Sequence, residues 1–121
     1  MAEENAMQYM LAIMYDPTLP ADGVPSRQKL HAALSDEMRA KGQWRGGGGL
    51  APIESYRKKI STVDGEKVFS DGPFAETREV LGGYFLVECS EEEAIAWAKR
   101  IDVDAGRSWV EVRAAWVDPR G

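Results

Sequence analysis

The chain has 121 residues, of which 44% are apolar and 29% are charged, and its 20 acidic and 15 basic residues give a formal net charge of −5 at pH 7. This length and composition predict one globular domain over residues 1–121, with a flexible N-terminus at about residues 1–6. The acidic balance argues against nucleic acid and anionic membrane surfaces as partners, because such partners select clustered Lys and Arg.

The N-terminal segment Met1–Ala6 is acidic and lacks the basic start and long apolar core of a signal peptide. No apolar run approaches membrane-spanning length. Cys89 is the single cysteine, so no internal disulfide can form, and we expect it to fill space in a strand. Together these features predict a cytoplasmic protein.

Two strands are expected in the first half of the chain. Met7–Tyr15 is almost continuously apolar, as in a central strand that is covered on both faces. The four glycines Gly46–Gly49 lie within a second segment, Gln43–Leu50. A bulged strand or a close backbone approach fits them better than a linker or a phosphate-binding loop.

A helix is expected between these strands, beginning at Pro25 or Ser26 and ending at Lys41. Leu30, Leu34 and Met38 recur at four-residue spacing and would form one apolar stripe. Proline suits the first turn of a helix, and the glycine after residue 41 suits its C-terminal stop.

The middle of the chain predicts a hairpin followed by another strand. Glu54–Val63 alternates roughly between polar and apolar residues, and Glu66–Ser70 would return as its partner. Asp64-Gly65 between them is a strong signal for a two-residue hairpin turn. After an irregular piece, Tyr84–Cys89 reads as a further strand.

A second helix and a last strand complete the chain. Ser90 and Glu93 have the spacing of a capping box at the helix start. The apolar residues that follow keep helical spacing: Ala94, Trp97, Ala98 and Ile101. Trp109–Val117 alternates and predicts the final strand.

Without the inserted Asp64-Gly65 hairpin, the elements follow a ferredoxin-like βαββαβ order of the α+β class. This arrangement predicts an antiparallel sheet with two helices on one face. Because the first strand is apolar on both sides, the other face also needs cover. A second copy of the sheet would supply it, so we expect a symmetric homodimer with its sheets packed face to face.

The segment Ser70–Thr77, with sequence SDGPFAET, predicts a rigid turn, because proline fixes its own φ and restricts the glycine before it. With this segment the chain resembles the DGPF-motif branch of the YCII-related family. Five further segments carry the resemblance: Tyr9–Tyr15, Gly47–Leu50 with Pro52, Leu81–Val87, Glu93–Ala98 and Val110–Arg113.

The resemblance implies a dimeric α/β-barrel domain. A His-Asp pair has been proposed as a catalytic centre in the broader family, and it would correspond here to Asp16 and His31. Some members are similar to proteins that occur beside extracytoplasmic-function sigma factors, which hints at a regulatory role.

From the residues alone, each candidate has two interpretations. His31 is the only histidine and could act as a general base, or could be a half-exposed helix residue. Asp16 could orient it, or could simply form a turn before proline. The remaining candidates would bind substrate, with the turn from Asp71 to Phe74 as a pocket wall: Asp71, Gly72, Pro73, Phe74, Arg57 and Tyr84. Asp71 could instead serve only to form the turn, and Arg57 could lie on a solvated strand face. No motif for a cofactor or a metal is present.

Two functions therefore remain open. One is an enzyme that performs acid/base chemistry, such as elimination or isomerisation, on a small molecule, with Asp16 and His31 as its pair. The alternative is a non-catalytic dimeric module that binds a ligand or a protein and is linked to transcriptional (sigma factor) regulation.

Overall fold

The computed structural model describes residues 7–24, 26–53, 57–71 and 78–116, so the expected flexible N-terminus lies outside the described residues. Two helices and six strands occur in this part of the chain: β1 (Met7–Tyr15), α1 (Gln28–Ala40), β2 (Trp44–Gly49), β3 (Lys58–Val63), β4 (Glu66–Asp71), β5 (Val80–Cys89), α2 (Glu91–Arg100) and β6 (Ser108–Ala114).

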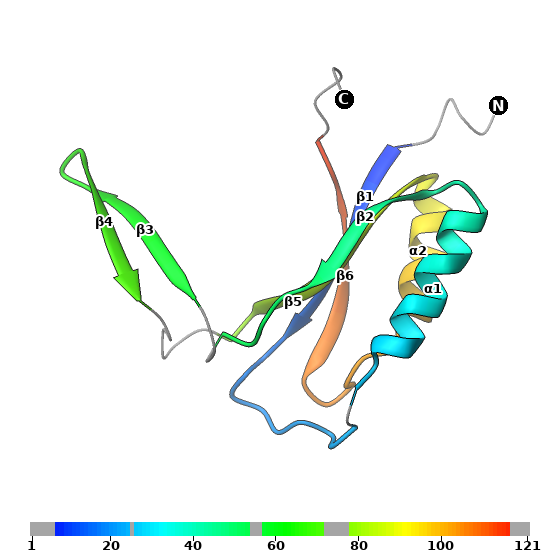
Figure 1. The fold of residues 1–121 in the computed structure, drawn as a ribbon, viewed down its shortest axis with the longest axis horizontal. Coiled ribbons are helices and arrows are strands. Elements are labelled where there is room, and N and C mark those ends of the chain that lie inside the picture. The colour runs from blue at the N-terminus through cyan, green and yellow to red at the C-terminus, as the bar shows by residue number, and fades with distance from the viewer. Residues whose placement is uncertain (1–6, 25, 54–56, 72–77, 117–121) are drawn as a thin grey trace.

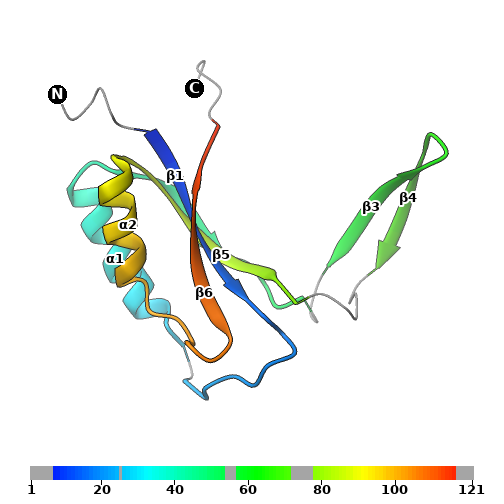
Figure 2. The ribbon, with the colours of Figure 1, turned by 180° about the vertical axis from the view of Figure 1, so that it is seen from behind.

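Four of the strands form an antiparallel sheet in the order β2-β5-β1-β6. Both helices lie on one face of this sheet, with α1 beside β2 (Figure 1) and α2 against β1 and β6 (Figure 2). Without β3 and β4, the element order is the predicted βαββαβ order of an α+β protein. Neither described helix is long and apolar enough to span a bilayer.

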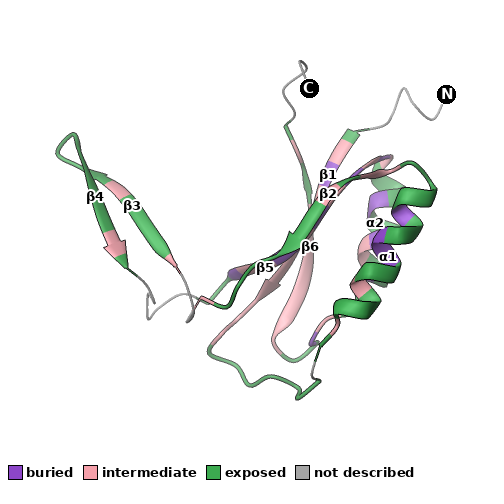
Figure 3. Ribbon diagram, viewed as in Figure 1, coloured by how far each residue is buried: buried purple, intermediate pink, exposed green. Residues whose placement is uncertain are grey.

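The core lies between the sheet and the helices (Figure 3). Its buried residues come from both layers: Tyr9, Leu11, Leu34, Met38, Phe85, Val87, Cys89, Ala94, Trp97 and Ile101. The alternation along β1 and β5 places one row of side chains on this face. The predicted stripe of α1 is correct at Leu34 and Met38, whereas Leu30 is 57% exposed because it lies on the outer side of the helix.

The capping box at the start of α2 is confirmed. The Glu93 N–H donates to Ser90 Oγ at 3.1 Å, and the Ser90 N–H donates to Glu93 Oε1 at 3.2 Å. Acidic residues in the first turn and basic residues in the last turn complement the helix dipole.

The predicted hairpin is confirmed over its described residues. Asp64 and Gly65 both have positive φ, 50° and 82°, which matches the turn that joins twisted strands most readily. Strands β3 and β4 form their own two-stranded sheet and project away from the main sheet (Figure 1). The cross-strand pair Ile60 and Phe69 is 70% and 61% exposed, so the hairpin carries apolar side chains into solvent.

Strand β5 begins earlier than the sequence predicts. Val80 already pairs with Tyr15 of β1, and the register shifts where Ile13 pairs with Gly83 and Met14 pairs with Leu81. The extra residue, Gly82, is therefore a β-bulge inside the strand, where glycine is common. The sequence pattern predicts Gly82 and Gly83 before this strand, whereas the structure places both glycines within it.

Candidate functional site

A pocket of about 520 Å³ lies between α1 and the edge of the sheet formed by β2 and β5. This volume suits a small molecule. Glycine backbone from β2 and β5 forms one side, together with Tyr84, Phe85 and Trp44, and side chains of α1 form the opposite side. Of the predicted substrate-binding residues that the structure describes, Tyr84 is the one that lines this pocket.

Side chains at four-residue spacing line the pocket from α1 and its N-cap: Arg27, His31, Ser35 and Arg39. Such residues form one ridge along a helix, so the fold of α1 places all four toward the sheet edge. Sequence reasoning identified only His31 in this row. The repeated spacing was present in the sequence, next to the apolar row of Leu34 and Met38.

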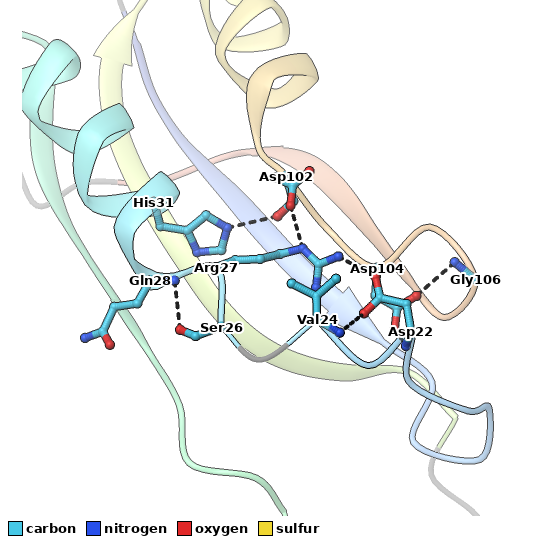
Figure 4. Close-up of polar contacts among 9 residues, drawn as sticks. All are labelled: Asp22, Val24, Ser26, Arg27, Gln28, His31, Asp102, Asp104 and Gly106. Atoms are coloured by element: carbon cyan, nitrogen blue, oxygen red, sulfur yellow. Dashed lines mark hydrogen bonds and ion pairs between the residues drawn. The ribbon is translucent and has the colours of Figure 1, made fainter.

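His31 is held by the main chain of the loop after α2. Its Nε2 atom lies 3.0 Å from the carbonyl oxygen of Asp102 (Figure 4). A carbonyl oxygen only accepts hydrogen bonds, so Nε2 must donate, and the neutral ring then carries its lone pair on Nδ1. No described residue forms a hydrogen bond with Nδ1. Phe85 packs edge-on against the ring, with 5.8 Å between ring centroids.

Arg27 links the loop before α1, through Asp22, to the loop after α2, through Asp102, whose carbonyl contacts His31 (Figure 4). Its guanidinium donates to Asp22 at 2.5 Å and to Asp102 at 2.6 Å. The hydrogen bond from Arg27, followed by that from the Val24 N–H, holds the pKa of Asp22 below its usual range. The buried carboxylate of Asp104 accepts from the Asp22 N–H at 2.7 Å and so joins the same loops.

Arg39 lies at the other end of the row. Its guanidinium carbon lies 4.4 Å from the ring centroid of Trp44, in cation–π geometry. Its Nη1 donates to Ser35 Oγ at 3.2 Å and to Asp36 at 3.3 Å. Because the Arg39–Asp36 pair is exposed, it holds the guanidinium weakly.

No Asp or Glu is among the described residues that line the pocket, although acidic residues outnumber basic ones in the chain. The charged lining residues are Arg27 and Arg39. Asp22 and Asp102 neutralise Arg27, so Arg39 is the lining cation that favours a negatively charged ligand.

The glycines of β2 have different reasons to be glycine. A Cβ on Gly47 would lie 2.7 Å from both the Trp44 ring and the backbone oxygen of Tyr84, so packing excludes a side chain there. A Cβ on Gly49 would meet nothing within 4 Å. Gly47 and Gly49 pair with Phe85 and Gly83, which places them on the helix side of the sheet. The absent side chain of Gly49 therefore leaves space in the pocket.

Asp16 has partners other than His31. Its carboxylate accepts from the Thr18 hydroxyl at 2.6 Å and from the Thr18 N–H at 2.9 Å, as in an Asx turn. These two hydrogen bonds hold the pKa of Asp16 below its usual range. Among the described residues, no hydrogen bond joins Asp16 to His31, and Asp16 does not line the pocket. The His-Asp pair stays a prediction.

The other predicted binding residues lie near the hairpin. Asp71 ends β4 and forms an ion pair with Lys58 across the hairpin, and Arg57 directly precedes β3. Neither lines the pocket. Gly72, Pro73 and Phe74, which were predicted to form a pocket wall, lie outside the described residues.

Cys89 is buried as expected, and burial raises the pKa of its thiol to about 11. The thiol therefore stays protonated at neutral pH, which makes it a poor nucleophile. Within the described ranges, no group of three or more His, Cys, Asp and Glu residues could hold a metal ion.

Comparison with known proteins gives two findings. The chain matches the YCII-related domain over residues 7–113. It is also 47% identical, over 36 residues, to an uncharacterised protein of Rhizobium meliloti (strain 1021), and this match spans 29% of each chain. The family match covers both helices and all six strands, except for the last residue of β6. The chain therefore belongs to the YCII-related family.

Proposed function

We propose that the pocket beside α1 binds a small anionic molecule and that His31 acts on it as a general acid/base. The observation that carries the proposal is the hydrogen bond from His31 Nε2 to the Asp102 carbonyl, in a pocket whose described lining has no carboxylate. The bond fixes the ring and leaves Nδ1 as the atom that can accept a proton. In an isomerisation, Nδ1 would remove a proton from one carbon of the ligand and return it to another; in an elimination, it would remove the proton while the bond from the neighbouring carbon to the leaving group breaks.

In this proposal the main-chain carbonyl of Asp102 orients the histidine, the role that the sequence assigned to Asp16. Arg27 acts as a positioning residue, because it ties Asp102 to Asp22. The lowered pKa of Asp16 makes that carboxylate a weak proton acceptor, which also favours His31 as the base.

A screen of small anions, cations and neutral molecules by NMR tests the proposal, because His31 is the only histidine and its ring signals report the pocket directly. We expect anions to shift these signals and at least one bound anion to be converted. His31→Gln should keep binding but lower conversion about 100-fold or more, since it lacks the proton acceptor. Anion binding without conversion by the wild type, or equal conversion by the variant, would favour the non-catalytic alternative.

We also propose that the chain forms a homodimer, as a dimeric α/β barrel of the DGPF-motif branch. The SDGPFAET segment supports the branch. The sheet face opposite the helices supports the dimer, because Met10, Met14, Leu86 and Trp109 place apolar groups there and neither helix covers them. Face-to-face sheet packing would bury these side chains.

Leu86→Glu should convert this dimer to monomers, because it places a charge in the proposed interface. Leu30→Glu is the matched control, since Leu30 is exposed on the outer side of α1. Light scattering after size exclusion should give twice the chain mass of 13.4 kDa for the wild type and for Leu30→Glu. A monomeric wild type, or a dimeric Leu86→Glu variant, would contradict the proposal.

A further inference from the structure

The two arginines that line the pocket from α1 and its N-cap, Arg27 and Arg39, differ in how far neighbouring carboxylates neutralise them. Two carboxylates neutralise Arg27, whose side chain is only 17% exposed. Arg39 has one exposed carboxylate partner at 3.3 Å, and its Nη2 atom makes no hydrogen bond to a described residue. Arg39 is therefore the cation that can form a strong, charge-assisted hydrogen bond with a ligand.

An apolar surface joins this cation to His31. Phe85 packs edge-on against both His31 and Trp44, with centroid distances of 5.8 Å and 6.2 Å. Arg39 stacks on the Trp44 ring. His31 and Arg39 are eight residues apart on α1, which advances the helix by about 12 Å. The pocket thus has a proton acceptor and a cation at its ends and an aromatic surface between them.

We infer that the pocket holds an elongated carboxylate, with its acid group at Arg39, its apolar chain over Phe85 and a polar group at His31. This inference rests on the proposed function of the pocket and names the class of molecule that it takes. One planar guanidinium suits a carboxylate, which it can bind through two parallel hydrogen bonds. The open space at Gly49 leaves room for the ligand chain on the side opposite α1.

Calorimetry with 8-hydroxyoctanoate, its neutral amide and the shorter 4-hydroxybutanoate tests the inference. We expect 8-hydroxyoctanoate to bind about 10- to 100-fold more tightly than the amide, because the amide lacks the charge that Arg39 binds. The shorter acid should bind more weakly than 8-hydroxyoctanoate, since it does not reach both ends of the pocket. Arg39→Gln should remove the preference for acid over amide.

Gly49→Val and Gly48→Val form a matched pair of variants. Both positions line the pocket through their backbone and have open space for a Cβ, but Gly48 pairs with Tyr84, so a side chain added to Gly48 would project from the opposite face of the sheet. Gly49→Val should weaken binding of 8-hydroxyoctanoate about tenfold or more, and Gly48→Val should bind it as the wild type does. Thermal melts would show that both variants are folded.

Equal affinity for acid and amide, or a preference that survives in Arg39→Gln, would overturn the carboxylate assignment. If either molecule still shifted the His31 ring signals, the proposed use of the pocket would stand and only the ligand class would fail. If the probes bound without any change at His31, the proposed function itself would fail.

Discussion

Replacing Trp97 with alanine is expected to lower the free energy of unfolding by about 3–5 kcal/mol, as for other large-to-small changes in a protein core. Trp97 is 4% exposed and belongs to the core between α2 and the sheet. Its Nε1 donates to the Gln43 side chain at 2.7 Å, which joins α2 to the segment between α1 and β2. The alanine variant would lose both the packing and this hydrogen bond.

Trp97→Phe is the matched comparison, because it keeps most of the apolar volume and loses the Nε1 donor. We expect it to cost about 1–2 kcal/mol, since the Gln43 oxygen loses its partner. Urea unfolding followed by circular dichroism measures both values. A cost below about 1 kcal/mol for Trp97→Ala would contradict the assignment of Trp97 to the core.

Gly47→Ala is expected to destabilise the protein by about 2–3 kcal/mol, the cost of overpacking a fixed site. The new Cβ would lie 2.7 Å from the Tyr84 backbone oxygen, which belongs to the neighbouring strand of the sheet. A change of side-chain rotamer cannot relieve a contact with backbone. Either β2 must separate from β5, or the clash must remain.

Gly49→Ala serves as the control for this prediction, because the same substitution two residues along the strand meets open space. It should be neutral or slightly stabilising, since alanine reduces the entropy of the unfolded chain. Urea unfolding of both variants gives the comparison. Equal stability of the two would show that the close approach at Gly47 does not constrain the sheet.

Much of this fold could be predicted from local sequence patterns. The apolar run of β1 gives a strand with the bounds that the structure has, and Ser90 and Glu93 form the expected capping box. The Asp64-Gly65 turn is equally local, since positive φ at both positions favours these residue types. Such features depend on a few neighbouring residues, and tertiary contacts do not override them.

The start of β5 could not be predicted in this way. Gly82 and Gly83 resemble a break before a strand, because glycine is rare in strand interiors. In the folded protein a Cβ on Gly83 would lie 3.0 Å from the backbone oxygen of Gly48, and Gly82 forms the bulge opposite β1. These reasons come from neighbouring strands, which a single-sequence pattern does not show.

The candidate site could be predicted only in part. His31 stands out as the sole histidine, but its partner, the Asp102 carbonyl, belongs to the main chain and has no residue-type signal. Asp16 attracts attention as an acid at a strand end, and its structure is that of a turn stabilised by Thr18. Arg39 and Gly49 become relevant only when α1 and β2 are placed side by side.

The proposed role of His31 requires that the Asp102 carbonyl hold its ring with Nδ1 free to accept a proton. Long-range ¹H–¹⁵N NMR of the ¹⁵N-labelled protein, at a pH where the ring is neutral, reports which ring nitrogen carries the hydrogen. Only one imidazole contributes, because the chain has a single histidine. We expect a hydrogen on Nε2 and none on Nδ1; a neutral ring with its hydrogen on Nδ1 would rule out the proposed role of His31.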